Sequence, residues 1–182
     1  MKLSVQIKTV RNLSNSDMAL MNKWRAKRIK EKKQKNFKKD YLPNPKFFFV
    51  KNKGKIVSFG ILRTININYL GKRYSIMGFC SIISIVKGKG YGKILMQAMI
   101  KDLKRTGKTG LGFCGRNNLR FYGKAGLKTK KGFIKRFVYK NPKTGEEIID
   151  NEGDGIYYEG KDKFISKVLS NKKPIYINVL HW

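Results

Sequence analysis

Carboxylates are scarce in this chain of 182 residues, which has 11 Asp and Glu residues against 42 Lys and Arg residues and a net charge of +31. Metal-binding side chains are scarcer still, with two cysteines and one histidine. Metal sites usually gather three or four such ligands, so this set predicts no bound metal. No apolar run approaches the ~20 residues that a membrane-spanning helix needs. We therefore expect a protein without a metal and without a membrane span.

The two cysteines, Cys80 and Cys114, fall in apolar runs that predict core strands. An unpaired thiol in such a strand behaves as a small hydrophobic group. The first eight residues alternate like a strand and contain no signal-peptide core. We expect a cytoplasmic protein, and proteins in that compartment rarely keep disulfides.

Length and pattern favour one mixed α+β domain over residues 1–182. A chain that is 41% hydrophobic can bury one good core, but it is too short for two comfortable domains. Apolar runs predict strands over residues 2–10, 47–51, 55–63, 74–83, 109–114, 133–139, 156–158 and 175–180. Helical spacing follows Ser16, the expected N-cap, and recurs after residues 91, 117 and 163. The expected architecture is a single central mixed sheet, mostly antiparallel, with helices on both faces.

The most informative segment is a glycine-rich loop, Val-Lys-Gly-Lys-Gly-Tyr-Gly-Lys over residues 86–93, between an apolar strand and an amphipathic helix. Glycines let successive backbone N–H groups point into one concavity. The helix that follows adds its free N–H groups and its positive dipole end. Three lysines of the loop, Lys87, Lys89 and Lys93, supply cations. The loop therefore predicts a diphosphate site.

Spacing decides between the known phosphate loops. The P-loop needs a glycine five residues before its Gly-Lys pair and a Ser or Thr after it, but the chain has Lys87 and Ile94 at those places. The dinucleotide pattern Gly-x-Gly-x-x-Gly also fails. The pattern that fits is (Gln/Arg)-x-x-Gly-x-(Gly/Ala), with Lys87 first, then Gly90 and Gly92. The loop thus resembles the coenzyme A loop of the GNAT superfamily of N-acetyltransferases, with a lysine where Gln or Arg is usual.

A second motif, residues 117–127, resembles the same family's short helix that ends in Phe/Leu-Tyr-x-x-x-Gly-Phe/Trp. Asn117 is the expected N-cap and Gly126 the residue that ends the helix. Tyr122 matches the position whose phenol faces the coenzyme's sulfur in many members. The alternative for Tyr122 is a core aromatic residue with its hydroxyl on a backbone carbonyl. The resemblance covers residues 73–127, the expected coenzyme A-binding core.

The resemblance implies a GNAT-like acyl-CoA N-acyltransferase fold, acetyl-CoA as co-substrate, and direct attack of an amine on the thioester. The amine must first lose a proton, because an ammonium with a pKa of ~10.4 is not nucleophilic. Tyr122 is the implied proton donor to the departing thiolate. The implied coenzyme-binding residues are Cys80, Ser81, Ile82, Lys87, Gly88, Lys89, Gly90, Tyr91, Gly92, Lys93, Asn117, Asn118 and Tyr122. Among them, the strand residues 80–82 are implied to bond the pantetheine arm and to stabilise the oxyanion through their backbone.

The general base is where this chain departs from the family's histone acetyltransferases, which place a glutamate on the strand before the loop. That place holds Ile76, and residues 41–101 contain no Asp or Glu. The remaining candidates are an ordered water held by backbone carbonyls, a carboxylate of residues 146–162, or His181.

Charge is distributed unevenly along the chain. Ten basic residues lie between Lys23 and Lys39, around Trp24 and Phe37. This basic segment is either a candidate for non-specific nucleic-acid or ribosome association or a solvated helix. Seven of the eleven acidic residues lie in residues 146–162, which form the acidic segment. Those acids either pair with neighbouring lysines or gather a cationic amine acceptor.

These features together favour an acetyl-CoA-dependent N-acetyltransferase. Two alternatives remain open, a nucleic-acid- or ribosome-associated protein that uses the fold as a binding platform, and an acyltransferase for a longer acyl group. The loop is expected to contact only the coenzyme's phosphates, so its sequence does not predict the length of the acyl group. Sequence also leaves open the acceptor and the oligomeric state.

Overall fold

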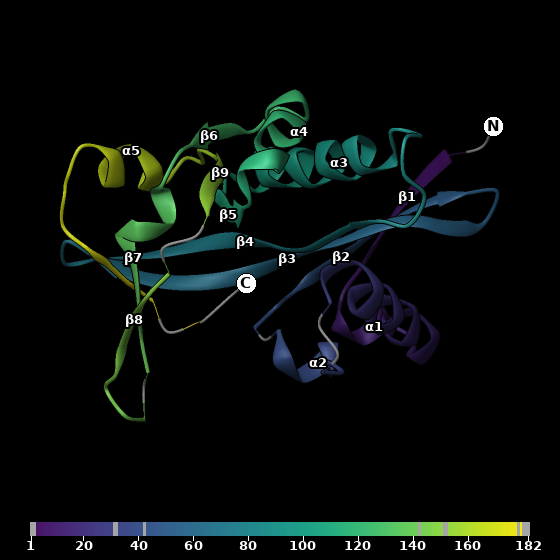
Figure 1. Ribbon diagram of the computed structural model, residues 1–182, viewed down its shortest axis with the longest axis horizontal. Coiled ribbons are helices and arrows are strands. Elements are labelled where there is room, and N and C mark those ends of the chain that lie inside the picture. Colours follow the sequence, from purple (N-terminus) through teal and green to yellow (C-terminus); the bar gives the residue numbers. More distant parts are fainter. Residues whose placement is uncertain are drawn as a thin grey trace. The chain divides into compact units, whose positions relative to one another are not determined.

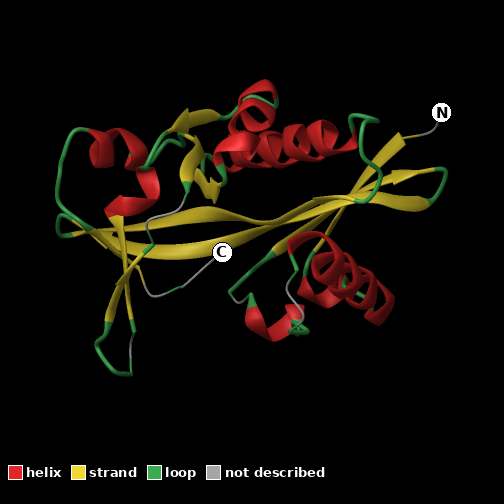
Figure 2. Cartoon of the chain, viewed as in Figure 1, coloured by secondary structure: helices red, strands yellow, loops and turns green. Residues whose placement is uncertain are grey.

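A computed structural model describes residues 3–30, 33–41, 43–141, 143–150, 153–177 and 179. Helices and strands within these residues are drawn in Figures 1 and 2. In chain order they are β1 (Leu3–Lys8), η1 (Val10–Asn12), α1 (Asn15–Ile29), α2 (Phe37–Asp40), β2 (Lys46–Asn52), β3 (Lys55–Tyr69), β4 (Lys72–Ser84), α3 (Tyr91–Thr106), β5 (Gly110–Cys114), η2 (Arg116–Asn118), α4 (Leu119–Lys124), β6 (Lys128–Lys130), η3 (Phe133–Arg136), β7 (Phe137–Lys140), β8 (Glu147–Ile149), β9 (Asp154–Tyr158), α5 (Phe164–Leu169) and β10 (Ile175–Ile177). The elements labelled η are 3-10 helices.

The chain divides into two compact units. The first unit is Met1–Thr64 with Phe79–Met99, and the second is Ile65–Gly78 with Ile100–Trp182. Strands β3 and β4 and helix α3 each contribute residues to both units. That the whole chain forms a single domain stays a prediction, and the two units are described separately below.

The first unit contains an antiparallel ladder, in which β2 pairs with β1 on one side and with β3 on the other. Lys53 and Gly54 join β2 to β3 with positive φ angles of 48° and 77°. Two such residues make the tight hairpin turn whose twist matches the flanking strands. This turn joins the strands that the sequence predicted over residues 47–51 and 55–63.

Helix α1 begins two residues earlier than the sequence pattern predicted. Its N-cap is Ser14, whose hydroxyl accepts a hydrogen bond from the Asp17 N–H at 3.1 Å, while the Asp17 carboxylate accepts one from the Ser14 N–H at 2.9 Å. This reciprocal pair is a capping box, which satisfies two otherwise unpaired donors. The prediction of Ser16 as the N-cap was wrong because Ser14-x-x-Asp17 forms the box.

Within the first unit, α1 and α3 contact opposite faces of the strands (Figure 1). A Cβ atom placed on Gly60 of β3 would lie 3.2 Å from the Leu95 side chain and 3.3 Å from the Met99 side chain, both on α3. On the other face, Arg25 of α1 donates a hydrogen bond to the hydroxyl of Ser81 on β4. The glycine lets the buried face of α3 approach the sheet closely.

The second unit contains most of the strand pairings. Its strands follow the order β6-β9-β5-β4-β3-β10-β7-β8. Most of these pairs are antiparallel, whereas β4–β5 and β10–β7 are parallel. The predicted class, a mixed and mostly antiparallel sheet in an α+β protein, is confirmed.

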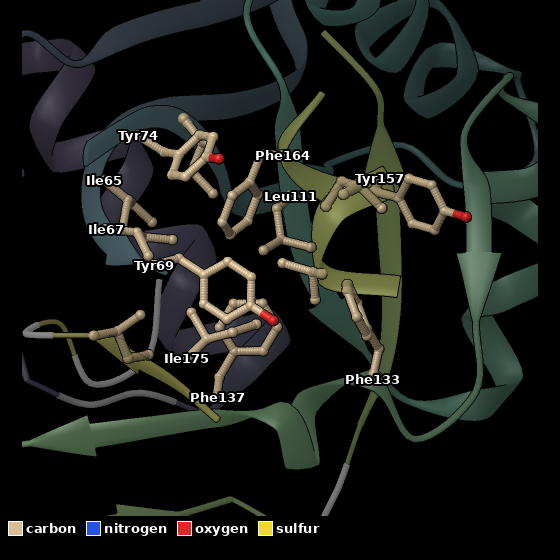
Figure 3. Packing of buried hydrophobic residues seen from close by; sticks show 14 residues of the cluster. Ile65, Ile67, Tyr69, Tyr74, Leu111, Phe133, Phe137, Tyr157, Phe164 and Ile175 are labelled. Atoms are coloured by element: carbon tan, nitrogen blue, oxygen red, sulfur yellow. The ribbon is translucent and has the colours of Figure 1, made fainter. Parts of the chain in front are cut away.

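The core of the second unit combines aromatic rings with Ile, Leu and Val side chains (Figure 3). Phe164 of α5 is fully buried. Its ring centroid lies 5.0 Å from that of Tyr74 and 6.2 Å from that of Tyr69. Phe133 and Phe137 pack edge to face on one another, with ring centroids 5.4 Å apart. Offset and edge-to-face pairs of this kind add to the stabilisation from apolar burial.

One predicted strand was wrong in part. Residues 133–139 were expected to be a strand, but residues 133–136 form the 3-10 helix η3 and only Phe137–Lys140 is extended. Gly132 enters the turn with φ 61°, and Gly155 has no Cβ, which lets the ring of Phe133 sit against it. A packing contact between segments distant in sequence thus overrides the local strand pattern.

Candidate functional site

The glycine-rich loop lies in the first unit, between the end of β4 and the start of α3. It is exposed from Lys87 to Gly90. Gly88 and Gly90 have φ angles of 76° and 75°, in the left-handed region that glycine adopts without strain. A Cβ on either glycine would have nothing within 4 Å, so the loop surface is open at both positions.

The N–H groups of this loop are available to a ligand. Within the part of the chain that the structure describes, the N–H groups of residues 87–92 have no hydrogen-bond partner. The next two, on Lys93 and Ile94, donate to the Gly90 carbonyl at 3.0 and 3.2 Å. Six consecutive free donors at the start of a 16-residue helix form the environment that a diphosphate requires. The amide of Lys93, by contrast, serves the helix cap.

The base of the loop is fixed at both sides. The N–H groups of Ile85 and Val86 donate to the carbonyl of Val57 on β3. Tyr91 is 7% exposed, and its hydroxyl accepts a hydrogen bond from the side chain of Asn52 at 2.9 Å. Tyr91 can therefore meet a ligand only through its backbone. The exposed side chains of Lys87, Lys89 and Lys93 have no carboxylate partner among the described residues.

Strand β4 carries a backbone irregularity just before the loop, at residues 80–82. Ser81 has φ 48°, which is uncommon for a residue with a side chain and rarer still inside a strand. A non-glycine residue held in this conformation marks a functional constraint more often than chance would give. Cys80 beside it is 2% exposed, and burial raises the pKa of its thiol to about 12. This cysteine is therefore a packing residue at neutral pH.

The second motif forms the short helix α4 in the second unit. The predicted N-cap was wrong, because Asn117 lies inside the 3-10 turn Arg116–Asn118 and Asn118 is the N-cap, without a side-chain cap bond. The predicted helix end is confirmed. Gly126 has φ 105°, its N–H donates to the Gly123 carbonyl, and the Leu127 N–H donates to the Tyr122 carbonyl. These two bonds are the Schellman pattern of a glycine-terminated helix.

Tyr122 is half-buried on α4, and burial raises the pKa of its phenol to about 12, with a smaller contribution from Cys114. Its ring packs edge to face on that of Phe121, at 4.9 Å between centroids. Within the described residues its hydroxyl makes no hydrogen bond to a backbone carbonyl, and the role of Tyr122 stays a prediction. The phenol stays protonated throughout the neutral range and can donate.

Three carboxylates of the acidic segment have structural roles in the second unit. Glu159 accepts hydrogen bonds from the N–H groups of Ile165 and Ser166, and Asp162 accepts one from the N–H of Phe164, all at the start of α5. Asp154 is 5% exposed and accepts the N–H of Gly132 at 2.7 Å. Carboxylates at a helix start stabilise its free N–H groups and its dipole.

The other acids leave few candidates for a general base. Glu146 and Glu147 are exposed, and Glu147 lies 3.8 Å from Lys140. His181 and Glu152 lie outside the described residues. Asp154 was not singled out from the sequence. It lies opposite Cys114 in the antiparallel pairing of β5 and β9. Its Oδ2 atom has no hydrogen-bond partner in the described chain.

The described part of the basic segment resembles a solvated helix more than a nucleic-acid platform. Phe37 is fully buried, and the ring of Trp24 is covered by the cations of Lys27 and Arg28 at 5.1 and 5.4 Å. The buried ring of Phe37 therefore cannot stack on a base. Arg25 differs from the exposed cations around it, because it is 3% exposed.

Two absences apply to the described residues. They contain no group of three His, Cys, Asp or Glu side chains arranged to hold a metal ion. None of their helices has the length and apolar character to cross a membrane.

Both cysteines are free thiols, and burial raises the pKa of Cys114 to about 11.

The motifs and their geometry agree with a comparison of the chain with known families. The profile of the acetyltransferase (GNAT) family matches residues 9–127, and the chain belongs to this family. It is accordingly an acyltransferase that uses an acyl-CoA. No curated protein matches the chain.

Several solved structures have the same fold. ElaA of Escherichia coli matches with a TM-score of 0.60 at 13% identity, covering 87% of this chain and 100% of that one. The N-acetyltransferase PseH of Campylobacter jejuni, solved in complex with acetyl coenzyme A, matches at 0.52 and 18% identity, over 86% and 99%. The ribosomal-protein-S18-alanine N-acetyltransferase of E. coli matches at 0.52 and 16% identity, over 85% and 91%. At these identities the likeness establishes the acyl-CoA N-acyltransferase fold and nothing finer.

Proposed function

We propose that this protein transfers the acetyl group of acetyl-CoA to an amine, which attacks the thioester directly while both substrates are bound. Family membership supports the acyl-CoA chemistry. The observation that carries the proposal is the run of partner-free N–H groups over residues 87–92, followed by the start of α3.

The loop is suited to the coenzyme's diphosphate for three reasons. Backbone N–H groups donate to phosphate oxygens, and such charge-assisted bonds are about twice as strong as neutral ones. The helix start adds a positive dipole end. The side chains of Lys87, Lys89 and Lys93 add cations without competing carboxylates in the described chain. The loop therefore fits the coenzyme that the family uses.

Acetyl-CoA supplies the thioester and its leaving thiolate. We assign the backbone of Cys80, Ser81 and Ile82 to the pantetheine arm and to the thioester oxygen, because Ser81 breaks the regular strand geometry there. In α4, Asn117 and Asn118 are assigned to the coenzyme. Tyr122 is assigned to the thiolate.

The pKa of about 12 for Tyr122 bears on how it acts. A phenol with this pKa is fully protonated at neutral pH, but it is a weaker acid than an ordinary thiol of pKa ~8.5. Full proton transfer to a thiolate is then uphill. We therefore assign to Tyr122 a hydrogen bond that stabilises the departing thiolate.

Binding of coenzyme A and of RNA separates this proposal from a nucleic-acid platform. Coenzyme A at 100 times its Kd should stabilise the protein by about 2.7 kcal/mol. Acetyl-CoA with a panel of amines should release free thiol, and propionyl- and butyryl-CoA in the same assay define the acyl length. No stabilisation by coenzyme A, together with RNA binding that weakens steeply with salt, would contradict the proposal.

A further inference from the structure

The second unit contains a pocket of about 560 Å³, a size typical of small-molecule sites. In β3, Ile65, Ile67 and Tyr69 belong to the core of this unit (Figure 3). Asn66 and Asn68 alternate with them, so both point to the other face of the sheet, where they line the pocket. The described residues around the pocket include none of those assigned to coenzyme A. The pocket is therefore a second site, on the sheet face opposite the core.

Neighbouring strands continue this row of polar side chains. Tyr176 of β10 lies opposite Asn68 in the antiparallel pairing of β10 with β3, and it lines the same pocket. The two-residue turn Leu70–Gly71, with φ angles of 50° and 72°, joins β3 to β4. This hairpin sets Arg73, another lining residue, opposite Asn68 on its other side. Because adjacent strands are ~4.8 Å apart, the backbones of Tyr176 and Arg73 are separated by ~10 Å.

The side chains of this row are available to a ligand. In the part of the chain that the structure describes, those of Asn66, Asn68, Arg73 and Tyr176 make no hydrogen bond, ion pair or ring contact. Each asparagine amide offers both donors and an acceptor. Tyr176 is 46% exposed, so its ring presents an open apolar face.

The charge around the pocket is positive. Arg73 is joined by Lys140 at the end of β7, and no Asp or Glu is among the described lining residues. The Nζ atom of Lys140 lies 3.8 Å from Glu147, but both side chains are about half exposed, so water weakens this pair. The turn between β7 and β8 supplies another wall through Asn141 and Gly145, whose N–H donates to the Asn141 carbonyl at 2.8 Å. Such a pocket favours an anion.

We infer that this pocket binds a nucleotide, because a nucleotide combines an anion, a planar ring and a polar ring edge in one small molecule. Its base stacks on the ring of Tyr176, as bases do on aromatic side chains. The edge of the base, which carries donors and acceptors, meets the amides of Asn66 and Asn68. The phosphate, at the other end of the molecule, is bound by Arg73 and Lys140. This inference goes beyond the proposed function and does not depend on it.

Calorimetric titration of the full chain tests the inference. The protein is first saturated with coenzyme A, so that a nucleotide cannot occupy the glycine-rich loop. The ligands are AMP, CMP, GMP and UMP, their nucleosides, which lack the phosphate, and ribose 5-phosphate, which lacks the base. We expect at least one nucleotide to bind about tenfold more tightly than its nucleoside and than ribose 5-phosphate. A short RNA with a 5′-phosphate is titrated in parallel, and tighter binding of this RNA than of any free nucleotide assigns the pocket to a nucleotide within a strand.

Four variants connect binding to the pocket. Tyr176→Ala should raise Kd for the preferred nucleotide about five- to hundredfold, whereas Tyr176→Phe keeps the ring and should stay within about twofold. Arg73→Met should raise Kd for the nucleotide about ten- to hundredfold and leave that for the nucleoside unchanged. Arg120→Met removes an exposed arginine elsewhere in the same unit and is the matched control, which should change neither Kd.

Several results would overturn the inference. These are no binding of any nucleotide or of the RNA, ribose 5-phosphate binding as tightly as every nucleotide, or Kd values in Tyr176→Ala and Arg73→Met that equal those in Arg120→Met. Nucleotide binding that disappears when coenzyme A is bound would place the nucleotide in the glycine-rich loop, and would overturn the inference as well. If Tyr176→Ala does not fold, Arg73→Met decides. Failure of coenzyme A to bind would instead contradict the proposed function, and the same variants then test the pocket in the protein without coenzyme A.

Discussion

Gly90 and Gly54 offer a matched pair for testing the loop. Both lie in the first unit, with φ angles of 75° and 77°, and a Cβ on either would meet nothing within 4 Å. Alanine at such a φ costs ~1–2 kcal/mol, and part of this is offset by ~0.4–1 kcal/mol from a stiffer unfolded chain. Gly90→Ala and Gly54→Ala should therefore lose similar stability, about 1 kcal/mol each.

Coenzyme A binding should separate the two variants. Alanine at position 90 relieves its strain by turning the peptide groups on either side, which moves N–H groups away from the diphosphate. One charged hydrogen bond is worth ~1.5–3 kcal/mol, so Kd should rise about ten- to hundredfold in Gly90→Ala and stay within twofold in Gly54→Ala. Calorimetric titration gives both Kd values directly.

Thermal stability provides a second readout of the same difference. At a concentration of coenzyme A that is 100 times the unmodified protein's Kd, the ligand should add ~2.7 kcal/mol to the unmodified protein and to Gly54→Ala. A tenfold weaker Kd lowers this gain to ~1.4 kcal/mol in Gly90→Ala. Equal Kd values for the two variants would refute the assignment of the diphosphate to this loop.

Three other predictions concern Tyr122, the α1 cap and the cysteines. Tyr122→Phe should lower kcat about ten- to hundredfold in a thiol-release assay and leave the coenzyme Kd within twofold; an unchanged kcat would remove Tyr122 from the mechanism. Burial raises the pKa of Asp17, but bonds from Lys8 and Ser14 outweigh this and hold it below the ordinary 3.8. Its stabilising contribution is thus complete above pH 3.8 and disappears as the pH falls through the lower native pKa, so Asp17→Asn should flatten acid unfolding in this range. Because burial raises the thiol pKa values of Cys80 and Cys114 to about 12 and 11, both should react with a disulfide reagent at pH 8 only after unfolding, and fast reaction of the folded protein would contradict this.

Most helices and strands could be predicted from the sequence, because apolar runs mark the strands and apolar residues at helical spacing mark the helices. The continuous apolar run in β2 and the helical spacing in α3 were clear in the sequence, and both elements are present. Strand β3 extends to Tyr69, six residues beyond the predicted end at Arg63. Within those six residues, Ile65, Ile67 and Tyr69 alternate into the core of the second unit. The sequence contains this alternation, but the interpretation stopped at a charged residue.

Some features of the site could likewise be predicted from local sequence, whereas others depend on contacts between segments distant in sequence. The loop and the helix end at Gly126 follow from glycine positions, which the sequence displays. The left-handed conformation of Ser81 and the burial of Arg25 occur in segments 56 residues apart in sequence, which the Arg25–Ser81 hydrogen bond joins. No local pattern distinguishes Arg25 from the exposed cations around it, so its burial became visible only in the folded chain.

Backbone amide exchange at the loop tests the central assignment most directly. Protein with and without saturating coenzyme A is followed by NMR or mass spectrometry over residues 87–92, with the hairpin turn at Lys53 and Gly54 as an internal reference. We expect exchange at the loop to slow at least tenfold with coenzyme A, while the reference turn is unchanged. Unchanged exchange at the loop, in a sample whose coenzyme A binding is established by calorimetry, would contradict the assignment of these N–H groups to the diphosphate.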